Sequence, residues 1–196
     1  MKRSDTSARY TGQALRAGLL ACCAVVLGGL ACAPVVPLRS KPGGAARWAF
    51  ALAREKATLW TTDARAGRVK GIGVGNEGWL PDRGGAWTVT FWSPSKNVEL
   101  NVVVDSDANV TTQEVTEPAL RGSVLPVEWI DSPRAWAATR AAQQGDPVNT
   151  LECELSQRAE PERYPQQTVW RIRFFTRDGQ TETHVVSTTG AWLTRY

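Results

Sequence analysis

The chain has a single histidine, His184, which is the first place to look for catalysis because histidine is the commonest acid–base side chain. Glu182 and Asp178 lie close to it in sequence and are the acids that could orient its ring. A hydrolase built on His184 with Glu182 or Asp178 would also need an activated nucleophile. No serine stands in a G-x-S-x-G elbow, so the sequence favours a non-enzymatic protein over this hydrolase.

Two other segments match part of a ligand-binding motif but lack the neighbouring residues or elements that the motif requires. Gly73–Gly78 spells G-x-G-x-x-G, yet residues 79–85 (WLPDRGG) cannot begin the helix that receives a pyrophosphate. Residues 105–109 (DSDAN) open like a calcium loop. Its sixth position is Val110 and its twelfth is Thr116, which excludes an EF-hand. We therefore predict no cofactor and no metal site.

The elements that would position any site follow from hydrophobic periodicity. Residues 45–55 are alanine-rich with helical spacing, and Asp131-Ser132-Pro133 is typical of a helix start. Alternating apolar and polar residues predict six short strands, at residues 69–74, 87–91, 98–104, 151–155, 170–175 and 181–187. The predicted order is one helix followed by three strands, occurring twice.

The two predicted hairpins align without a gap at a constant offset of 83 residues. Identical residues coincide in four pairs: Trp87 and Trp170, Phe91 and Phe174, Glu99 and Glu182, Val102 and Val185. We therefore predict an α+β fold of two tandem units, each a helix laid across a small antiparallel sheet. The first unit covers residues 45–117 and the second covers residues 118–196.

A helix, a hairpin and the pattern V-x-V-D-x-x-x-x-V resemble the PepSY and PepSY-like domains of bacterial envelope proteins. The pattern occupies residues 102–110 (VVVDSDANV), and its second copy occupies residues 185–193 (VVSTTGAWL). The D-x-x-T-G ending of that family is split between the copies, since the first keeps Asp105 and the second keeps Thr189-Gly190. The resemblance implies an envelope-located, non-catalytic domain that binds protein or peptide.

The offset also predicts which strand residues face outward. It aligns Thr183, Val185 and Ser187 with the apolar stripe of residues 100–104, so these should face the core. The alternate positions form an expected outer face that comprises Arg171, Arg173, Phe175, Glu182 and His184.

Nine tryptophans form the second candidate binding feature. Four occupy helical or inward strand positions and are expected in the core: Trp48, Trp87, Trp136 and Trp170. Trp79 lies in a Gly/Pro loop and Trp92 on the outward phase of its strand, where an aromatic favours a partner surface. The alternative is a loop folded over the sheet, with Trp92 hidden beneath Trp79.

The N-terminal residues are typical of a secretory leader. Residues 1–16 are polar and basic, and residues 17–30 form an uncharged apolar run of fourteen. Because a membrane-spanning helix needs about 20 apolar residues, the run fits a signal peptide better. Leu30-Ala31-Cys32 resembles the lipobox of bacterial lipoproteins, which implies a leader at residues 1–31 and an acyl chain on Cys32. Cleavage at Ala31-Cys32-Ala33 by ordinary signal peptidase, and an uncleaved anchor, are the alternatives.

The remaining cysteines and the distribution of charge limit the kinds of metal site and partner that the chain can have. Cys22 and Cys23 lie in the leader and Cys32 would be acylated, which leaves Cys153 without a disulfide partner. Cys153 and His184 alone cannot build a zinc site. The net charge of +4 belongs to the leader, since residues 32–196 hold 19 basic and 18 acidic side chains. A nearly neutral chain lacks the basic footprint of a nucleic-acid binder.

These observations predict a non-enzymatic lipoprotein of the bacterial cell envelope, held by Cys32 at the outer membrane or at the periplasmic face of the inner membrane. Residues 32–44, rich in Pro and Gly, would be its tether. Its expected partner is an envelope protein or peptide, such as a peptidase that it restrains. The alternatives are the hydrolase based on His184 and a carrier that holds a glycan or lipid between the two units.

Overall fold

The computed structural model describes residues 44–196, so the predicted leader, Cys32 and most of the predicted tether lie outside the described residues. The helices are α1 (Ala46–Trp60), α2 (Ser132–Thr139) and the short 3-10 turn η1 (Arg140–Ala142). The strands are β1 (Arg65–Ile72), β2 (Ala86–Ser93), β3 (Val98–Asp105), β4 (Val110–Val115), β5 (Pro147–Ser156), β6 (Val169–Thr176), β7 (Thr181–Ser187) and β8 (Trp192–Arg195).

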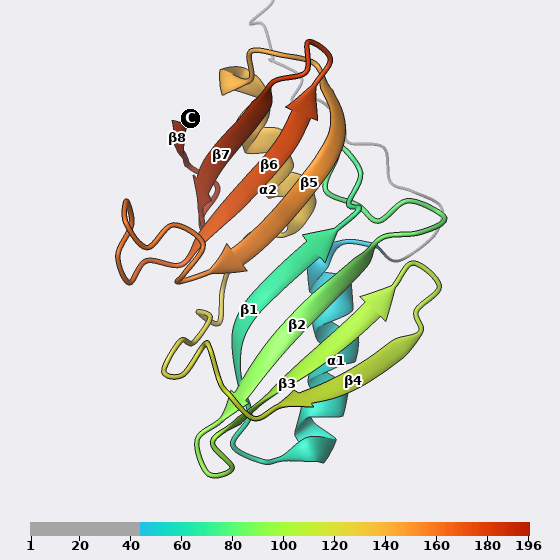
Figure 1. Cartoon of the computed structure of the whole chain (residues 1–196), viewed down its shortest axis with the longest axis vertical. Helices are drawn as coiled ribbons and strands as arrows, with labels where there is room; N and C mark the ends of the chain where they lie inside the picture. Colours follow the sequence, from blue (N-terminus) through green and yellow to red (C-terminus); the bar gives the residue numbers. More distant parts are fainter. Residues whose placement is uncertain (1–43) are drawn as a thin grey trace, which may run out of the picture. The chain divides into compact units, whose positions relative to one another are not determined.

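All eight strands form one sheet in the order β4-β3-β2-β1-β5-β6-β7-β8, and every neighbouring pair is antiparallel (Figure 1). The prediction of an α+β fold with two helix-plus-sheet units is therefore wrong. The described chain is predominantly β, since the two α-helices contribute only 15 and 8 residues.

Pairing between β1 and β5 is the reason that two separate sheets do not exist. Four residue pairs, from Arg68–Ser156 to Gly71–Cys153, join the strands with which each half of the sheet begins. On one face the buried core runs across this junction without a break, because the rings of Trp87 and Trp170 meet with centroids 6.4 Å apart. The Trp129 ring also packs against this cluster, with its centroid 5.9 Å from the centroid of the Trp170 ring.

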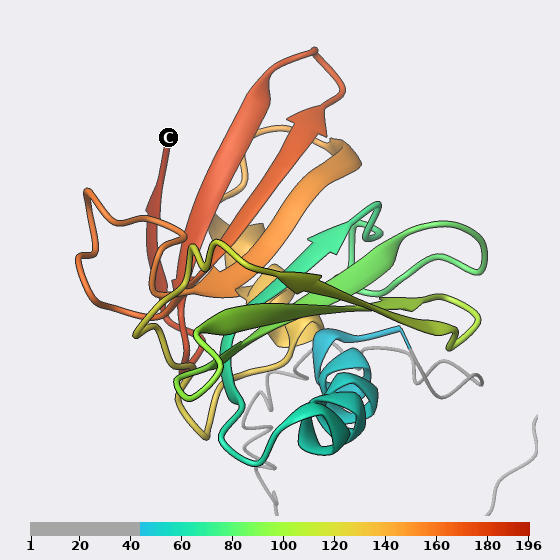
Figure 2. The same ribbon diagram turned by 60° about the horizontal axis from the view of Figure 1, so that its bottom comes forward.

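Both α-helices lie on this same face of the sheet (Figure 2). The buried face of α1 is a stripe of small side chains, Ala46, Ala49, Ala53 and Ala57. The spacing of three and four residues keeps them on one side of the helix, and methyl groups let its backbone approach the sheet closely. α1 contacts β2 and β3 most extensively, whereas α2 packs against β7.

Asp131 and Ser132 cap both helices at once. The Asp131 side chain accepts from the backbone N–H of Ser132 at the start of α2, as the Asp-Ser-Pro motif predicts. The same Asp131 carboxylate accepts from the N–H of Arg47 at 2.9 Å, and the Ser132 hydroxyl accepts from the N–H of Ala46 at 2.9 Å. Since α1 has no capping side chain of its own, this contact supplies partners for its unpaired first turn.

We expect the alanine stripe of α1 to be intolerant of larger side chains. Ala53→Leu forces extra atoms between α1 and the sheet at a fully buried position and should lower the free energy of unfolding by about 1–3 kcal/mol. Ala51→Leu is the matched control, because Ala51 is exposed on the same helix and should change stability by less than about 0.5 kcal/mol. Chemical denaturation measures both, and equal effects would contradict the packing.

Candidate functional site

The outward phase predicted for β7 is wrong, because the two hairpins have turns of different length. Ser93 pairs with Val98 across a four-residue turn, whereas Thr176 bonds Gln180 across a three-residue turn. One residue fewer reverses the faces of the returning strand. Val185 therefore lies opposite the helices, while His184 faces the core and is completely buried.

His184 belongs to an aromatic stack beneath α2. Trp136 of α2 stacks on Phe174 with centroids 5.2 Å apart, and Phe174 stacks on His184 at 5.4 Å. Arg171 and Arg173, expected beside His184, project from the opposite face of β6. The structure thus separates the predicted outer-face residues into two groups, with Glu182 and His184 on the helix side and Arg171, Arg173 and Phe175 on the other.

Both ring nitrogens of His184 have partners. The Trp192 indole N–H donates to Nδ1 at 3.3 Å, so the neutral ring carries its proton on Nε2 and donates it to Glu182 Oε2 at 2.9 Å. Burial lowers the pKa of His184 despite the nearby carboxylate, and Arg195 lowers it further. Glu182 also accepts from the N–H of Gly145 at 2.8 Å. The ring therefore ties β7, β8 and the segment after η1 together.

A cluster of charged side chains occupies the helix-free face of β1, β5 and β6; we call it the β5–β6 charged cluster. At its centre, Arg171 forms ion pairs with Glu152, with Glu154 at 3.0 Å and with Glu160 at 3.7 Å. Glu152 is also paired with Lys70 at 3.1 Å and with Arg173 at 3.7 Å. Its members are Lys70, Glu152, Glu154, Glu160, Arg171 and Arg173.

Interactions within this cluster favour the charged forms of Glu152 and Arg171. Burial opposes ionisation of Glu152, but Arg171 and Lys70 outweigh burial and lower its pKa. Arg171 responds in the opposite sense: burial would lower its pKa, yet Glu152 and Glu154 raise it.

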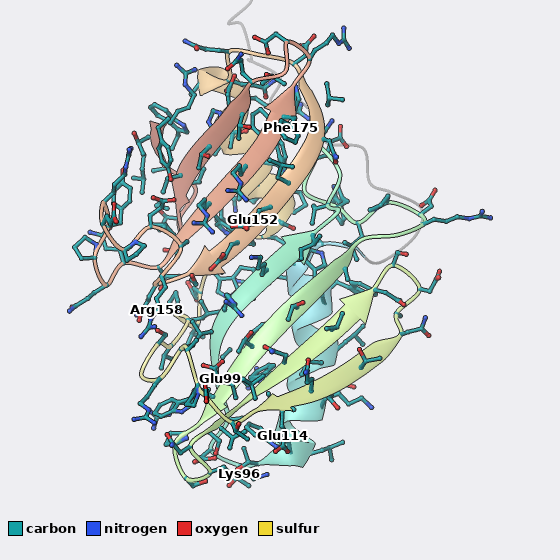
Figure 3. The ribbon with its side chains drawn as sticks, in the orientation of Figure 1. Lys96, Glu99, Glu114, Glu152, Arg158 and Phe175 are labelled. Carbon is teal, nitrogen blue, oxygen red and sulfur yellow. The ribbon has the colours of Figure 1, made fainter. Side chains whose placement is uncertain are left out.

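An exposed apolar and cationic surface adjoins this cluster, and we call it the β6 surface. Arg173 and Phe175 alternate along β6 with side chains that are 45% and 41% exposed. Ile72 of β1 is 60% exposed. It follows Gly71, which pairs with Cys153, so the same register places Ile72 beside Glu152 of β5. Glu152 in turn pairs with Arg173 of β6. Two strand spacings separate Ile72 from β6, about 10 Å. Figure 3 shows Glu152 and Phe175 on this face.

Trp79 and Trp92 do not form a joint surface. Trp92 pairs with Arg65 at the first residue of β1, whereas Trp79 follows the last residue of β1 by seven positions. The length of β1 separates the two regions by about 20 Å. Each is half-buried, and the Trp92 indole nitrogen is enclosed without a hydrogen-bond partner. Trp92 is therefore not hidden beneath Trp79.

A groove of about 720 Å³ lies on the helix side, beside the N-termini of α1 and α2. Arg47 and Arg134 line it together with Glu128 and Asp131, so its charges cancel. Arg47 already donates to the Trp129 carbonyl at 3.0 Å and lies 4.6 Å above the Trp129 ring.

Sequence analysis named Arg171 and Arg173 as outward-facing residues of this site but missed Lys70, Glu152, Glu154 and Glu160. Glu152 and Glu154 flank Cys153 at alternate positions. This alternation is the only sequence pattern that indicates that the two carboxylates lie on the same face of the strand. Lys70 comes from another strand and Glu160 from a loop. Cys153 itself is fully buried, and burial raises the pKa of its thiol.

Among residues 44–196, no group of three or more His, Cys, Asp or Glu side chains is placed to hold a metal ion. None of the helices there has the length and apolar character needed to cross a membrane.

Comparison with family models, curated proteins and solved structures found no match to the chain. The PepSY-like resemblance therefore stays a prediction, and the geometry of the described residues must carry the functional argument.

We expect stability to depend on pH through His184, the only histidine in the chain. A histidine whose folded pKa lies below the ordinary 6.5 stabilises the fold while neutral, so the free energy of unfolding should fall as pH drops below about 6.5. His184→Gln should cost about 1–3 kcal/mol at pH 7.5 by disturbing the Trp192 and Glu182 contacts.

Denaturation of both proteins at pH 7.5 and pH 5.5 tests this expectation. The loss of stability between these pH values should be clearly smaller in His184→Gln than in the native chain. An unchanged loss would show that another group controls it.

Proposed function

We propose that the chain is a non-enzymatic, lipid-anchored protein of the bacterial envelope that binds a partner protein through the β6 surface. The observation that carries the proposal is the group of exposed side chains Ile72, Arg173 and Phe175 on the helix-free face, next to the charged cluster. Arginine and aromatic side chains are enriched at protein interfaces, and arginine is enriched among the residues that contribute most to binding. The aliphatic Ile72 extends the area that a partner would remove from water.

The charged cluster beneath the patch supports this assignment because it fixes the arginines. Arg171 is held by Glu152 and Glu154, and Glu152 also contacts Arg173. A side chain already restrained before association loses less conformational entropy when a partner binds. A partner with an acidic or carbonyl group for Arg173 and an apolar pocket for Phe175 fits the surface best.

The partner is identified by placing a photo-reactive phenylalanine analogue at position 175 in living cells. We expect irradiation to produce one prominent covalent adduct with an envelope protein, identified by mass spectrometry. Arg173→Glu in the same chain should reduce its yield about tenfold or more, because a central interface arginine is worth about 2 kcal/mol.

The matched control is the same analogue at Ala51, which is exposed on α1 on the opposite side of the sheet. Position 51 should give no comparable adduct. Equal adducts at both positions, or an adduct at 175 that ignores Arg173→Glu, would contradict binding at the β6 surface.

The anchor has its own test. The intact mass of the protein purified from membranes should equal that of a chain beginning at Cys32 plus a diacylglyceryl group and an acyl chain. Cys32→Ala should remove the lipid mass and shift the protein from the membrane fraction. A native mass without lipid would refute the anchor, whatever the outcome at position 175.

A further inference from the structure

β4 leaves one edge of the sheet open. It pairs with β3 over six residues without a register shift, and among residues 44–196 no strand pairs with its other side (Figure 1). Residues 111–114 are all exposed. Edge strands are commonly protected by charged side chains, especially lysine, by proline, by a bulge or by being very short. The strand (VTTQEV) has no lysine, proline or bulge, its one charged side chain, Glu114, is engaged by the Trp60 indole, and its β-branched side chains favour extended pairing.

A shallow groove accompanies this edge on the helix side. It has a volume of about 360 Å³ and lies between the C-terminal end of α1 and β4; its lining is Lys56, Leu59, Trp60, Leu100, Thr112 and Glu114. Leu59 is 84% exposed, and Glu114 is held by the Trp60 indole N–H at 2.6 Å. A strand added beside β4 would lie about 4.8 Å further out, with alternate side chains toward Leu59 and Lys56.

We propose that a second copy of this chain supplies that strand, so that β4 pairs antiparallel with β4 across a two-fold axis. This two-fold axis is perpendicular to the sheet, so the helices of both copies lie on the same side of the extended sheet. Two residues that pair across the axis must therefore have side chains that point to the same face. The central pair is then Thr112 with Thr112, or Gln113 with Gln113. Glu114 faces Val110 in the first register and Thr112 in the second, so no like charges oppose.

The flanking side chains favour the same occupant. The second copy carries Glu114 on the face where the first copy presents exposed Lys56, and the reciprocal contact forms by symmetry. Leu59 of each copy loses exposure against the neighbouring strand. The opposite edge, β8, is a poor substitute because it has four residues and a register shift. The pairing therefore closes as a dimer and does not continue as a filament.

The interface is small, so we expect a weak dimer. A six-residue edge with one leucine on each side buries less than the ~1,600 Å² of a standard interface, which suggests a dissociation constant on the order of 10 μM. Sedimentation velocity of the full chain in detergent, from about 1 to about 200 μM, should show monomer changing to dimer around that value.

Charge variants on β4 make the test specific. Thr111→Lys with Gln113→Lys places lysine opposite lysine in both registers, and Thr111→Glu with Gln113→Glu places glutamate opposite glutamate. Each double variant should stay monomeric, and an equimolar mixture of the two should recover the dimer because opposite charges then pair. Loss of folding cannot produce such a recovery. Thr194→Lys on β8 is the matched edge control and should leave the dimer intact.

Three results would overturn the proposal: a native chain that stays monomeric, a dimer that both β4 variants retain, or a mixture that fails to recover. A monomeric native chain that captures an extended peptide through β4 would assign the edge to another protein. The inference does not rest on the proposed function, because the β6 surface and the β4 edge are read out by different variants.

Discussion

The antiparallel pairing of β1 with β5 is the contact on which the rest of the structure depends, because it turns two sets of strands into one sheet. It places the rings of Trp87 and Trp170 against each other, and the Trp129 ring packs edge-on against Trp170. Gly71 shows how closely the junction is packed: a Cβ atom there would lie 2.6 Å from the Trp87 ring. Shared capping of both helices by Asp131 and Ser132 then fixes the helical layer over the same junction.

The helix-free face of that junction is stabilised by charge. Lys70 of β1, Glu152 of β5 and Arg171 of β6 form a continuous chain of ion pairs across three strands. Burying carboxylates is costly, and the pairs offset this cost only because each acid has several partners. A shift of one residue would turn these charges into the aromatic core. We therefore interpret the cluster as a determinant of register between the two halves of the sheet, as well as a support for Arg173.

Features that depend on a local pattern of residues could be predicted from the sequence. Features that depend on pairing with a distant strand, or on the exact number of residues in a turn, could not. The burial of Trp87, Trp136 and Trp170 followed from periodicity and is confirmed, as is the span of β7 at residues 181–187. β4 was missed because its residues 111–114 are all polar, and Trp129 because it lies in a connection without periodicity. The orientation of His184 depended on one residue in a turn, which an ungapped offset cannot reveal. The β1–β5 pairing, and with it the fold class, joins strands about 80 residues apart and leaves no local signal.

The exposed surfaces follow from how the sheet is covered. The helices occupy one face, while the loop that carries Ala159 and Tyr164 packs over Val169 and Val185 on the other. Leu125 and Leu120 bring a second loop to Ala66 and Glu99. The contacts at Ala66 and Val169 lie near the first residues of β1 and β6, whereas Ile72 and Phe175 lie near the last residues of these strands. Pairing through β4 would extend the sheet within its own plane and so leave the β6 surface free. Because the two-fold axis is perpendicular to the sheet, the dimer would present two β6 surfaces on the same side. If the proposed dimer forms, its two linked surfaces would raise the avidity for a partner with repeated sites without any new contact.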